Sequence, residues 1–397
     1  MKKKLLFMVI NMNIGGTEKA LLSLLQEIPQ EKYDVTVLML EKYGGFLDLI
    51  PAWVNVKILD GYLEIKDELN NPPKTVAINY FKKGRLIETI KICAYHGMAK
   101  VMKERTQYYK YLLKKFNTYE NDYDIAVAYA GPMDFISYFI IYKIRAKYKV
   151  QWIHFDVTKI GFNRNFVRKI YSHFDRIYTV SEEGKEKFCK LMPFLKHKTV
   201  RFENIISSKH IVEMSERGKG FTDYFDGIRI LTVGRLSKEK GQDMTICVMA
   251  RLKREGYPIR WYSIGEGSAR KEYENLIAQY KLEKDYVLLG STPNPYPFMK
   301  QCDLYVQPSR HEGYCITLAE AKHLLKPIVA TNFTGAKEQI TDELTGLIVD
   351  INEEDLYLAI KKILDNPDKC KGFVSQLKRE THMKNESPIK YLLENTI

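Results

Sequence analysis

Two glutamates eight positions apart carry the clearest chemical information in this sequence. Glu312 and Glu320 lie within SRHEGYCITLAEA, residues 309–321. An apolar run precedes this segment and a helix-forming run over 316–325 ends it, which predicts Glu312 in a strand-to-helix loop and Glu320 about two turns into the helix. Backbone N–H groups at a helix start bind anions, and a buried carboxylate needs donors such as vicinal hydroxyls. The spacing predicts a phosphate site beside a ribose anchor, as a sugar nucleotide requires.

Two basic residues flank a second loop of the same kind. Arg235 and Lys240 lie in TVGRLSKEKG, residues 232–241, which begins at the end of an apolar run. A guanidinium binds phosphate oxygens through two parallel N–H groups, and an ammonium adds a point charge. A solvated basic loop is the alternative, but the spacing at a strand end favours neutralisation of a diphosphate without a metal ion.

Glycines follow three further strand-like runs. Gly15 and Gly16 stand between the first apolar run and the first helical run, and Gly265 and Gly290 end two later runs. Glycine lets the backbone turn tightly and approach a ligand closely. The pattern differs from the G-x-G-x-x-G dinucleotide fingerprint. Each turn alone is weak evidence, and an ordinary turn is the alternative at each position.

One histidine stands at the expected end of a buried strand. His154 lies in QWIHFD, residues 151–156, where parallel strands deliver side chains to a ligand cleft. An imidazole there is able to hydrogen-bond a sugar hydroxyl or a reacting group, although a lone histidine is more often structural. Asp156 is the candidate to orient the ring or to contact an acceptor.

Strand-like and helix-like runs alternate along all 397 residues. The apolar runs are rich in Val, Ile and Leu without strict alternation, which is typical of parallel strands buried on both faces. A polar stretch at 203–227 interrupts the rhythm, and the length suits two domains. We therefore expect an α/β protein of two doubly wound, Rossmann-like domains, 1–205 and 206–380, facing across a cleft. The expected strands are 4–10, 35–40, 54–59, 125–129, 150–154, 176–180, 199–202, 228–233, 259–264, 286–289, 304–306, 328–330 and 346–349.

The formal net charge of +13 favours an anionic partner. Segment 74–116 holds eleven Lys or Arg against two Glu, with seven aromatic residues among them. Basic amphipathic segments with aromatics suit an anionic membrane surface. A solvated helical face with its aromatics in the core is the equal alternative. No nucleic-acid-binding module occurs, so a nucleic-acid partner is not expected.

The chain begins MKKKLLFMVI, a basic start followed by a short apolar run. This run continues into NMNIGG without a small-residue cleavage site, which predicts a first buried strand rather than a secretory signal. No apolar stretch approaches the length of a transmembrane helix. The six cysteines are scattered and form no CxxC pair, so neither disulfides nor a metal site is expected.

Taken in order, these motifs resemble those of retaining glycosyltransferases of family 4, which have the GT-B fold. The resemblance rests on Gly-Gly after the first strand, GR-x4-KG at 234–241, Gly-x-Gly at 265–267, PNPYPFMK at 293–300 and Glu-x7-Glu at 312–320. It covers nearly the whole chain. It implies transfer of a sugar from a nucleotide diphosphate donor, expected to be a UDP-sugar, to an acceptor hydroxyl. Retention at the anomeric carbon and no metal or other cofactor are also implied.

The resemblance also implies a role for each candidate residue. The expected catalytic residues are His154, Arg235, Lys240 and Glu312. The expected donor-binding residues are Gly15, Gly16, Gly265, Gly290, Gly313, Tyr314, Cys315 and Glu320. The sequence departs from the family at Tyr314-Cys315, where Phe-Gly is common, and at Glu18-Lys19, where Glu-Arg is common. The first departure leaves the donor sugar open.

By the same resemblance, domain 1–205 would face the acceptor, domain 206–380 would bind the nucleotide sugar, and a C-terminal helix over 381–397 would cross back to the first domain. We expect a lipid-linked saccharide acceptor in surface polysaccharide or glycolipid synthesis. The protein would be cytoplasmic and peripheral at the inner face of the cell membrane, through 74–116. The alternatives are a soluble glycosyltransferase that acts on a protein or small molecule, and a non-enzymatic nucleic-acid-binding protein.

Overall fold

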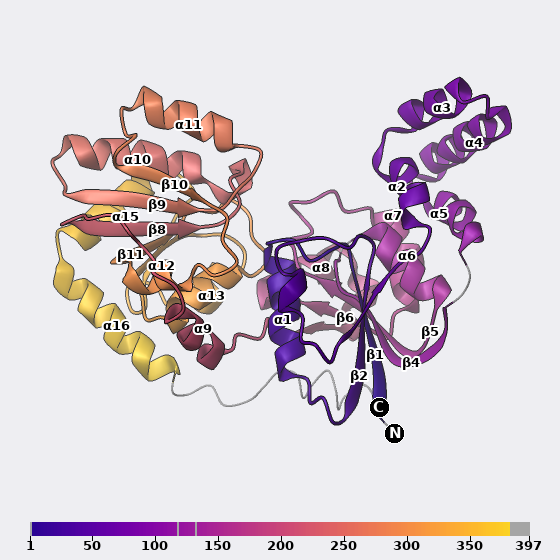
Figure 1. Ribbon diagram of the computed structural model, residues 1–397, viewed down its shortest axis with the longest axis horizontal. Helices are drawn as coiled ribbons and strands as arrows, with labels where there is room; N and C mark the ends of the chain where they lie inside the picture. The colour runs from indigo at the N-terminus through magenta and orange to yellow at the C-terminus, as the bar shows by residue number, and fades with distance from the viewer. Residues whose placement is uncertain (1, 117–118, 132, 382–397) are drawn as a thin grey trace.

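Two α/β domains lie side by side in this computed structural model, which describes residues 2–116, 119–131 and 133–381 (Figure 1). Each domain is built on one sheet of parallel strands, in the orders β3-β2-β1-β4-β5-β6-β7 and β10-β9-β8-β11-β12-β13. The strand order reverses between β1 and β4 and between β8 and β11. A doubly wound sheet opens a crevice at such a point, beyond the carboxyl ends of its strands.

The strands and helices follow the expected alternation. The strands are β1 Lys3–Val9, β2 Tyr33–Met39, β3 Asn55–Ile58, β4 Tyr119–Ala128, β5 Ile144–Ile153, β6 Arg176–Thr179, β7 Thr199–Arg201, β8 Ile228–Val233, β9 Ile259–Ile264, β10 Tyr286–Gly290, β11 Leu304–Gln307, β12 Ile328–Thr331 and β13 Leu347–Val349. The helices are α1 Gly16–Glu27, α2 Tyr62–Asn70, α3 Pro73–Lys82, α4 Leu86–Met102, α5 Thr106–Leu112, α6 Asp134–Lys143, α7 Arg164–Ile170, α8 Glu182–Leu191, α9 Ser208–Ser215, α10 Gln242–Arg254, α11 Arg270–Gln279, α12 Tyr296–Gln301, α13 Ile316–His323, α14 Ala336–Gln339, α15 Glu353–Leu364 and α16 Pro367–Thr381.

Burial on both faces explains why the strands read as continuous apolar runs. In β1, Leu6 and Met8 pack in one core, whereas Leu5, Phe7 and Val9 pack in the core on the opposite side of the sheet. Successive side chains of a strand point to opposite faces, so both sets must be apolar when helices cover both faces. The prediction of two parallel-sheet domains is confirmed.

Two strands are longer than expected. β4 and β5 begin at Tyr119 and Ile144, six residues before the apolar runs that predicted them. β1 pairs with β4 only from Ile125 onward, so the first residues of β4 and β5 pair with each other beyond the edge of β1. Several side chains of this extension are exposed, such as Arg145. The apolar signal is therefore absent there.

One helix start differs from expectation. Ser181 caps α8, because its side chain accepts a hydrogen bond from the N–H of Gly184. Helix α1 begins at Gly16, and Gly15 holds the extended cap position. Helix α13 begins at Ile316, which places Glu320 little more than one turn into the helix rather than two.

The polar stretch between the sheets contains a helix that the sequence did not reveal. Ile211 of α9 packs in the second domain's core beside Leu231 and Met299. We therefore propose 1–205 and 206–380 as the domain limits. The expected crossing helix, 381–397, lies outside the described residues beyond Thr381.

Four helices, α2 to α5, are inserted between β3 and β4 of the first domain. Figure 1 shows α3 and α4 as a hairpin that projects from the body of this domain. None of the helices formed by the described residues is long and apolar enough to cross a membrane.

Polar contacts join the two domains on one side of the crevice between them. The Ser181 hydroxyl donates to the carbonyl of Gly313 over 3.0 Å. The carboxylate of Glu338 accepts the backbone N–H groups of Glu182 and Glu183, both at 2.9 Å. These free N–H groups belong to the first turn of α8, so a side chain of the second domain completes a helix of the first.

Candidate functional site

A cavity of about 640 Å³ lies between the two domains, at the carboxyl ends of both sheets. This volume is in the range of small-ligand sites. The walls come from the start of α1 and from the loops after β1, β5, β8, β9, β10 and β11. The predicted site residues that line it are Gly15, Gly16, His154, Arg235, Lys240, Gly265, Glu312, Gly313, Tyr314 and Cys315. Gly290 and Glu320 are not among its lining residues.

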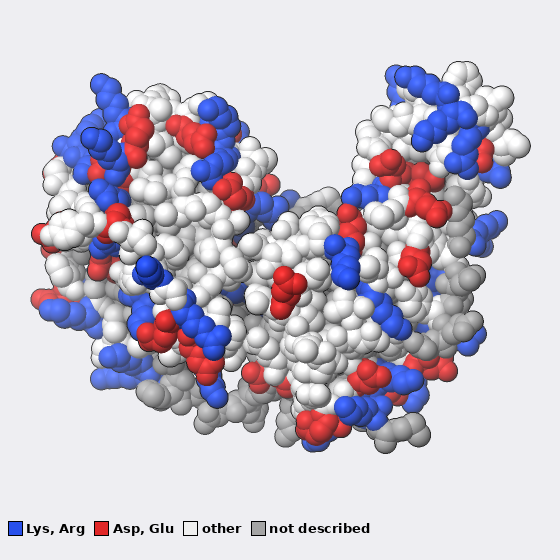
Figure 2. Space-filling model, viewed as in Figure 1, with Lys and Arg blue, Asp and Glu red and all other residues white. Residues whose placement is uncertain are grey.

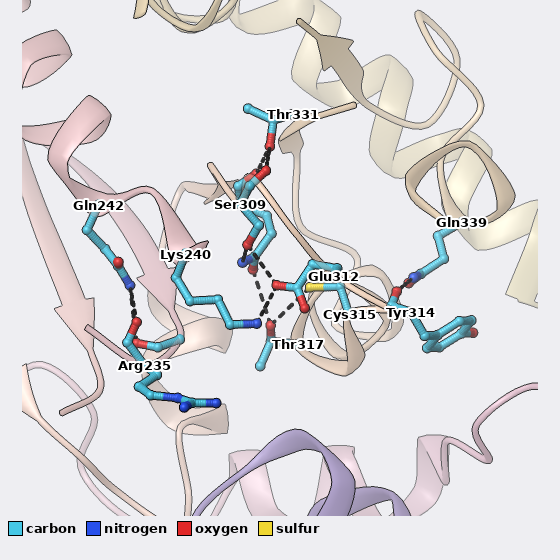
Figure 3. Close-up of polar contacts among 12 residues, drawn as sticks. Arg235, Lys240, Gln242, Ser309, Glu312, Tyr314, Cys315, Thr317, Thr331 and Gln339 are labelled. Atoms are coloured by element: carbon cyan, nitrogen blue, oxygen red, sulfur yellow. Dashed lines mark hydrogen bonds and ion pairs between the residues drawn. The ribbon is translucent and has the colours of Figure 1, made fainter. Parts of the chain in front are cut away.

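Lys240 and Glu312 form an ion pair on the wall of the second domain (Figure 3). The Lys240 Nζ lies 2.6 Å from Glu312 Oε1, and the Ser309 hydroxyl donates to the same oxygen over 2.7 Å. Burial disfavours the charged lysine, but the neighbouring carboxylate outweighs this and raises the pKa of Lys240. Lys240 therefore stays charged on the cavity wall.

Arg235 is the exposed cation of the same wall. Its guanidinium lines the cavity and makes no ion pair with any residue that the structure describes. The Gln242 side-chain amide donates to the carbonyls of Gly234 and Arg235, at 3.2 and 3.0 Å, and so holds the loop (Figure 3). A fixed loop with an unpaired guanidinium is suited to bind an anion.

Two glycines are required by close backbone contacts. A Cβ on Gly265, where φ is +148°, would lie 2.0 Å from the Gly234 carbonyl oxygen. A Cβ on Gly313 would lie 1.9 Å from the carbonyl oxygen of His154, which belongs to the other domain. Gly290 ends β10, and its carbonyl accepts the N–H of Gly265 over 2.8 Å. Gly290 thus supports the cavity wall from behind.

Glu320 is paired across the domains. Its Oε1 lies 2.8 Å from Nζ of Lys19 in α1 and accepts the Tyr296 hydroxyl over 2.9 Å. Its Oε2 is buried and has no hydrogen-bond partner among the described residues. Because Lys19 itself lines the cavity, Glu320 lies directly behind the wall with one unsatisfied acceptor.

His154 is a neutral group on the first domain's wall. Burial lowers its pKa to about 3, although a hydrogen bond to the Tyr129 backbone opposes this shift. Its Nε2 is buried without a hydrogen-bond partner in the described part of the chain. A neutral imidazole with an unsatisfied nitrogen is available to a hydroxyl in the cavity.

Asp156 has a structural position instead of a place beside the His154 ring. Its Oδ2 lies 2.8 Å from Nζ of Lys187 and 2.7 Å from the hydroxyl of Thr334 in the second domain. Burial works against ionisation, but hydrogen bonds from Lys187, Thr158 and Thr334 lower the pKa of Asp156 to about 2. Asp156 therefore links the two domains as a carboxylate.

Tyr314 and Cys315 connect the Glu312 loop to both cores. Tyr314 packs with the first domain's core and Cys315 with the second's. Cys315 takes the left-handed conformation, with φ +63°, as the cap of α13. Its thiol lies 3.5 Å from the Thr317 hydroxyl, and burial raises the pKa of this thiol. Cys315 is therefore a neutral packing residue of the wall.

Several polar wall residues were missed by sequence reasoning. They are Asn11, Asn13, Glu18, Asn204, Glu266 and Thr317. Burial raises the pKa of Glu18, against the effect of Arg235 across the cavity. The signal for Asn11 and Glu18 was their place beside the Gly15-Gly16 turn. Asn204 follows the last strand of its sheet and had no motif around it.

No group of three or more His, Cys, Asp or Glu side chains within the described ranges is placed to hold a metal ion. The expected independence of metal stays a prediction.

The family match lies in the second domain. Residues 224–380 match the family model of glycosyl transferases group 1. A Campylobacter jejuni protein is 28% identical over 218 residues, which cover 54% of this chain and 58% of that protein. Its name is N-acetylgalactosamine-N,N'-diacetylbacillosaminyl-diphospho-undecaprenol 4-alpha-N-acetylgalactosaminyltransferase. The Staphylococcus aureus capsular polysaccharide biosynthesis glycosyltransferase CapM is 31% identical over 134 residues, 32% of this chain and 33% of CapM. The matches thus span less than two thirds of these relatives.

Solved structures match nearly the whole chain. Anabaena HepE in complex with UDP and glucose superposes with a TM-score of 0.70 at 17% identity and covers 99% of both chains. WaaG, a glycosyltransferase involved in lipopolysaccharide biosynthesis, gives a TM-score of 0.60 at 15% identity over 96% of both chains. These likenesses show the fold. The architecture is GT-B, and residues 224–380 are similar to the glycosyl transferases group 1.

Proposed function

We propose that this protein is a retaining glycosyltransferase of family 4 that transfers a sugar from a UDP-sugar to a hydroxyl of a lipid-linked saccharide. The observation that carries the proposal is the unpaired Arg235 beside the Lys240–Glu312 pair, in a cavity between the two domains of a GT-B fold. The family match at 224–380 covers these residues. HepE has been solved with UDP, with UDP and glucose, and with UDP-glucose, which supports UDP as the nucleotide of the donor.

The proposed chemistry rests on charge stabilisation. The bond between the anomeric carbon and the diphosphate oxygen breaks, and its electron pair goes to the diphosphate. Arg235 and Lys240 stabilise this charge from fixed positions, which is worth more in a closed cavity than in water. The acceptor oxygen bonds to the anomeric carbon on the face that the diphosphate leaves, and its proton passes to the departing diphosphate. Retention then needs no protein nucleophile.

The wall of the first domain would hold the sugar and the acceptor. The neutral His154 of the first domain offers its unsatisfied nitrogen to a sugar hydroxyl, while Glu320 of the second domain offers its unsatisfied oxygen to the ribose. The Campylobacter relative carries a diphospho-undecaprenol acceptor in its name, which supports a lipid-linked acceptor here. A cytoplasmic site at the inner membrane face follows from that acceptor and from a nucleotide-sugar donor.

A glycosyltransferase with a small-molecule acceptor is the second candidate. Alpha-D-kanosaminyltransferase of Streptomyces kanamyceticus is 31% identical over 142 residues, and its name contains no lipid. The acceptor assays below distinguish the two.

The donor is tested by thermal unfolding with a panel of UDP-, GDP-, ADP- and CMP-sugars. A ligand that binds the native state raises its stability, by about 2.7 kcal/mol at a hundred times the Kd. We expect the largest rise in Tm with a UDP-sugar, and the same rise in EDTA. A larger rise with another base contradicts UDP, and no rise with any of them contradicts the donor site. A donor that passes is then incubated with polyprenyl-diphosphate saccharides and with free saccharides.

The diphosphate site is tested by replacing its cations. Arg235→Ala and Lys240→Ala are each expected to lower kcat/KM about 10²- to 10³-fold, as loss of a transition-state charge partner does. Lys238→Ala is the matched control, since this lysine is 75% exposed on the same turn and faces Glu272. Its kcat/KM should stay within a factor of two. If Arg235→Ala and Lys240→Ala have the same kcat/KM as Lys238→Ala in steady-state transfer assays, these two cations do not form the diphosphate site.

The ribose anchor is tested by the preference for UDP over its 2′-deoxy analogue. A hydroxyl bound to a buried carboxylate contributes enough for about a tenfold preference. Glu320→Gln should abolish that preference in calorimetric titrations, while Lys19→Met, which breaks the same ion pair, should keep it. If Glu320→Gln binds the two nucleotides as differently as the native protein does, Glu320 does not contact the 2′-hydroxyl.

His154 predicts a pH dependence of stability. The folded state keeps this imidazole neutral down to about pH 3, whereas the unfolded state takes up a proton below about pH 6.5. Stability is therefore lost as the pH falls through this window. Between pH 7.5 and 5.0 the free energy of unfolding, measured in urea, should fall by about 2 kcal/mol more for the native protein than for His154→Gln. His197→Gln, at an exposed position, should behave as the native protein. Equal losses in all three proteins contradict a buried neutral His154.

A further inference from the structure

Helix α4 presents an apolar stripe to the outside of the molecule. Ile87, Ile90, Ala94, Met98 and Val101 follow one another at intervals of three or four residues, so they share one face of the helix. All five are exposed; the largest fractions are 68% at Ile90 and 83% at Val101. The stripe runs along nearly the whole helix.

The opposite face of α4 packs inward, and it is partly polar. Glu88, Thr89, Ile92, Tyr95 and Ala99 are buried or half-buried. A surface helix of a globular protein has its apolar stripe toward the core and its polar side chains outward. In α4 the most apolar face is the exposed one, which indicates a partner outside the protein.

The neighbouring helix extends this surface. α3 packs beside α4 in the hairpin and exposes Ile78 and Phe81, which lie three positions apart. Eight of the 24 large hydrophobic side chains that are exposed in the described residues belong to α3 and α4. Scattered exposed apolar residues are normal, but a contiguous group marks an interaction site.

Basic side chains surround the stripe. Lys82, Lys83, Lys91, Lys100 and Lys103 are exposed, and none forms an ion pair with a described residue. The two acidic residues of the segment are engaged elsewhere: Glu88 pairs with Arg85, and Glu104 is buried against Lys169. Figure 2 shows blue side chains among white ones over the projecting end of the first domain. The partner is therefore expected to be both apolar and anionic.

We propose that the α3–α4 hairpin docks on the surface of an anionic lipid bilayer. Aliphatic side chains flanked by lysines are suited to the boundary between acyl chains and acidic headgroups. A second copy of this chain fits less well, because two hairpins would bring their lysines together. The inference goes beyond the proposed sugar transfer, since the surface needs neither donor nor acceptor to bind.

Most aromatic residues of segment 74–116 do not belong to the exposed surface of the hairpin, although the sequence suggested that they would face a membrane. Tyr108, Tyr109 and Phe116 are buried in the first domain's core, and Tyr95 stacks on Tyr111 with ring centroids 4.7 Å apart. Phe81 is the exposed exception, at 63%. The core alternative was right for most of the aromatics, while aliphatic residues supply the exposed face.

The test is flotation of the full chain with vesicles of phosphatidylcholine, alone or with phosphatidylglycerol. We expect binding to the acidic vesicles, weaker at high salt, and little binding to neutral ones. Ile87→Gln with Ile90→Gln should weaken the binding about tenfold or more. Lys82→Glu with Lys83→Glu should also weaken it about tenfold or more, because each basic residue near an anionic surface contributes about fivefold.

Matched controls come from the second domain. Leu358→Gln alters a half-exposed apolar residue of α15, and Lys284→Glu reverses an exposed lysine. Both should float as the native protein does. Native binding by the hairpin variants, or no binding of the native protein to acidic vesicles, overturns the proposal. A second copy of the chain is the partner of the stripe if two results are found together. The native protein does not bind vesicles, and it forms a dimer in sedimentation velocity that the hairpin variants do not form. Unchanged UDP affinity in every variant separates this result from failure of the donor site.

Discussion

Charge balance in the cleft is the constraint on which the site depends. Glu312 and Glu320 come from one loop and its helix, and unpaired carboxylates there would repel a diphosphate and be costly to bury. Each is neutralised by a lysine from a different element, Lys240 after β8 and Lys19 in α1. Arg235 is then the cation left without a carboxylate partner among the described residues. The arrangement pairs both carboxylates of the acidic motif and leaves the Arg235 guanidinium available to an anion.

This balance makes the site a property of the interface between the domains. Lys19 and Glu320 belong to opposite domains, so the charge on Glu320 is compensated only while they face each other. The contact of Gly313 with the His154 carbonyl leaves no room for a Cβ and fixes the Glu312 loop against the first domain. A ligand that uses Oε2 of Glu320 adds to these contacts, whereas one that takes Oε1 competes with Lys19. Ligand binding and domain contact are thus coupled through one carboxylate.

The sequence predicted the strands well because their signal is local. Burial on both faces forces continuous apolar runs, and the glycine and charged motifs follow those runs directly. It did not predict the partners of the motif residues, because a pairing such as Lys19 with Glu320 joins segments some 300 positions apart. Gly290 was expected in the cavity and instead supports Gly265. The exposed stripe of α4 was not predicted for another reason: the direction of its aliphatic side chains depends on tertiary packing, which the charged and aromatic residues of 74–116 do not reveal.

The lysines and the apolar stripe of the α3–α4 hairpin would contribute to membrane binding over different distances. Attraction between the basic hairpin and acidic headgroups falls off within about 8–10 Å at physiological salt. It raises the rate of encounter, but exposed charges alone hold a protein weakly. The stripe on α4 supplies the short-range apolar term that screening does not remove. An enzyme whose acceptor is confined to a bilayer needs both terms, because its cleft must stay near the surface for as long as a turnover lasts. None of the lining residues of the cavity comes from the hairpin, so the proposed membrane attachment and the proposed donor binding can be altered independently.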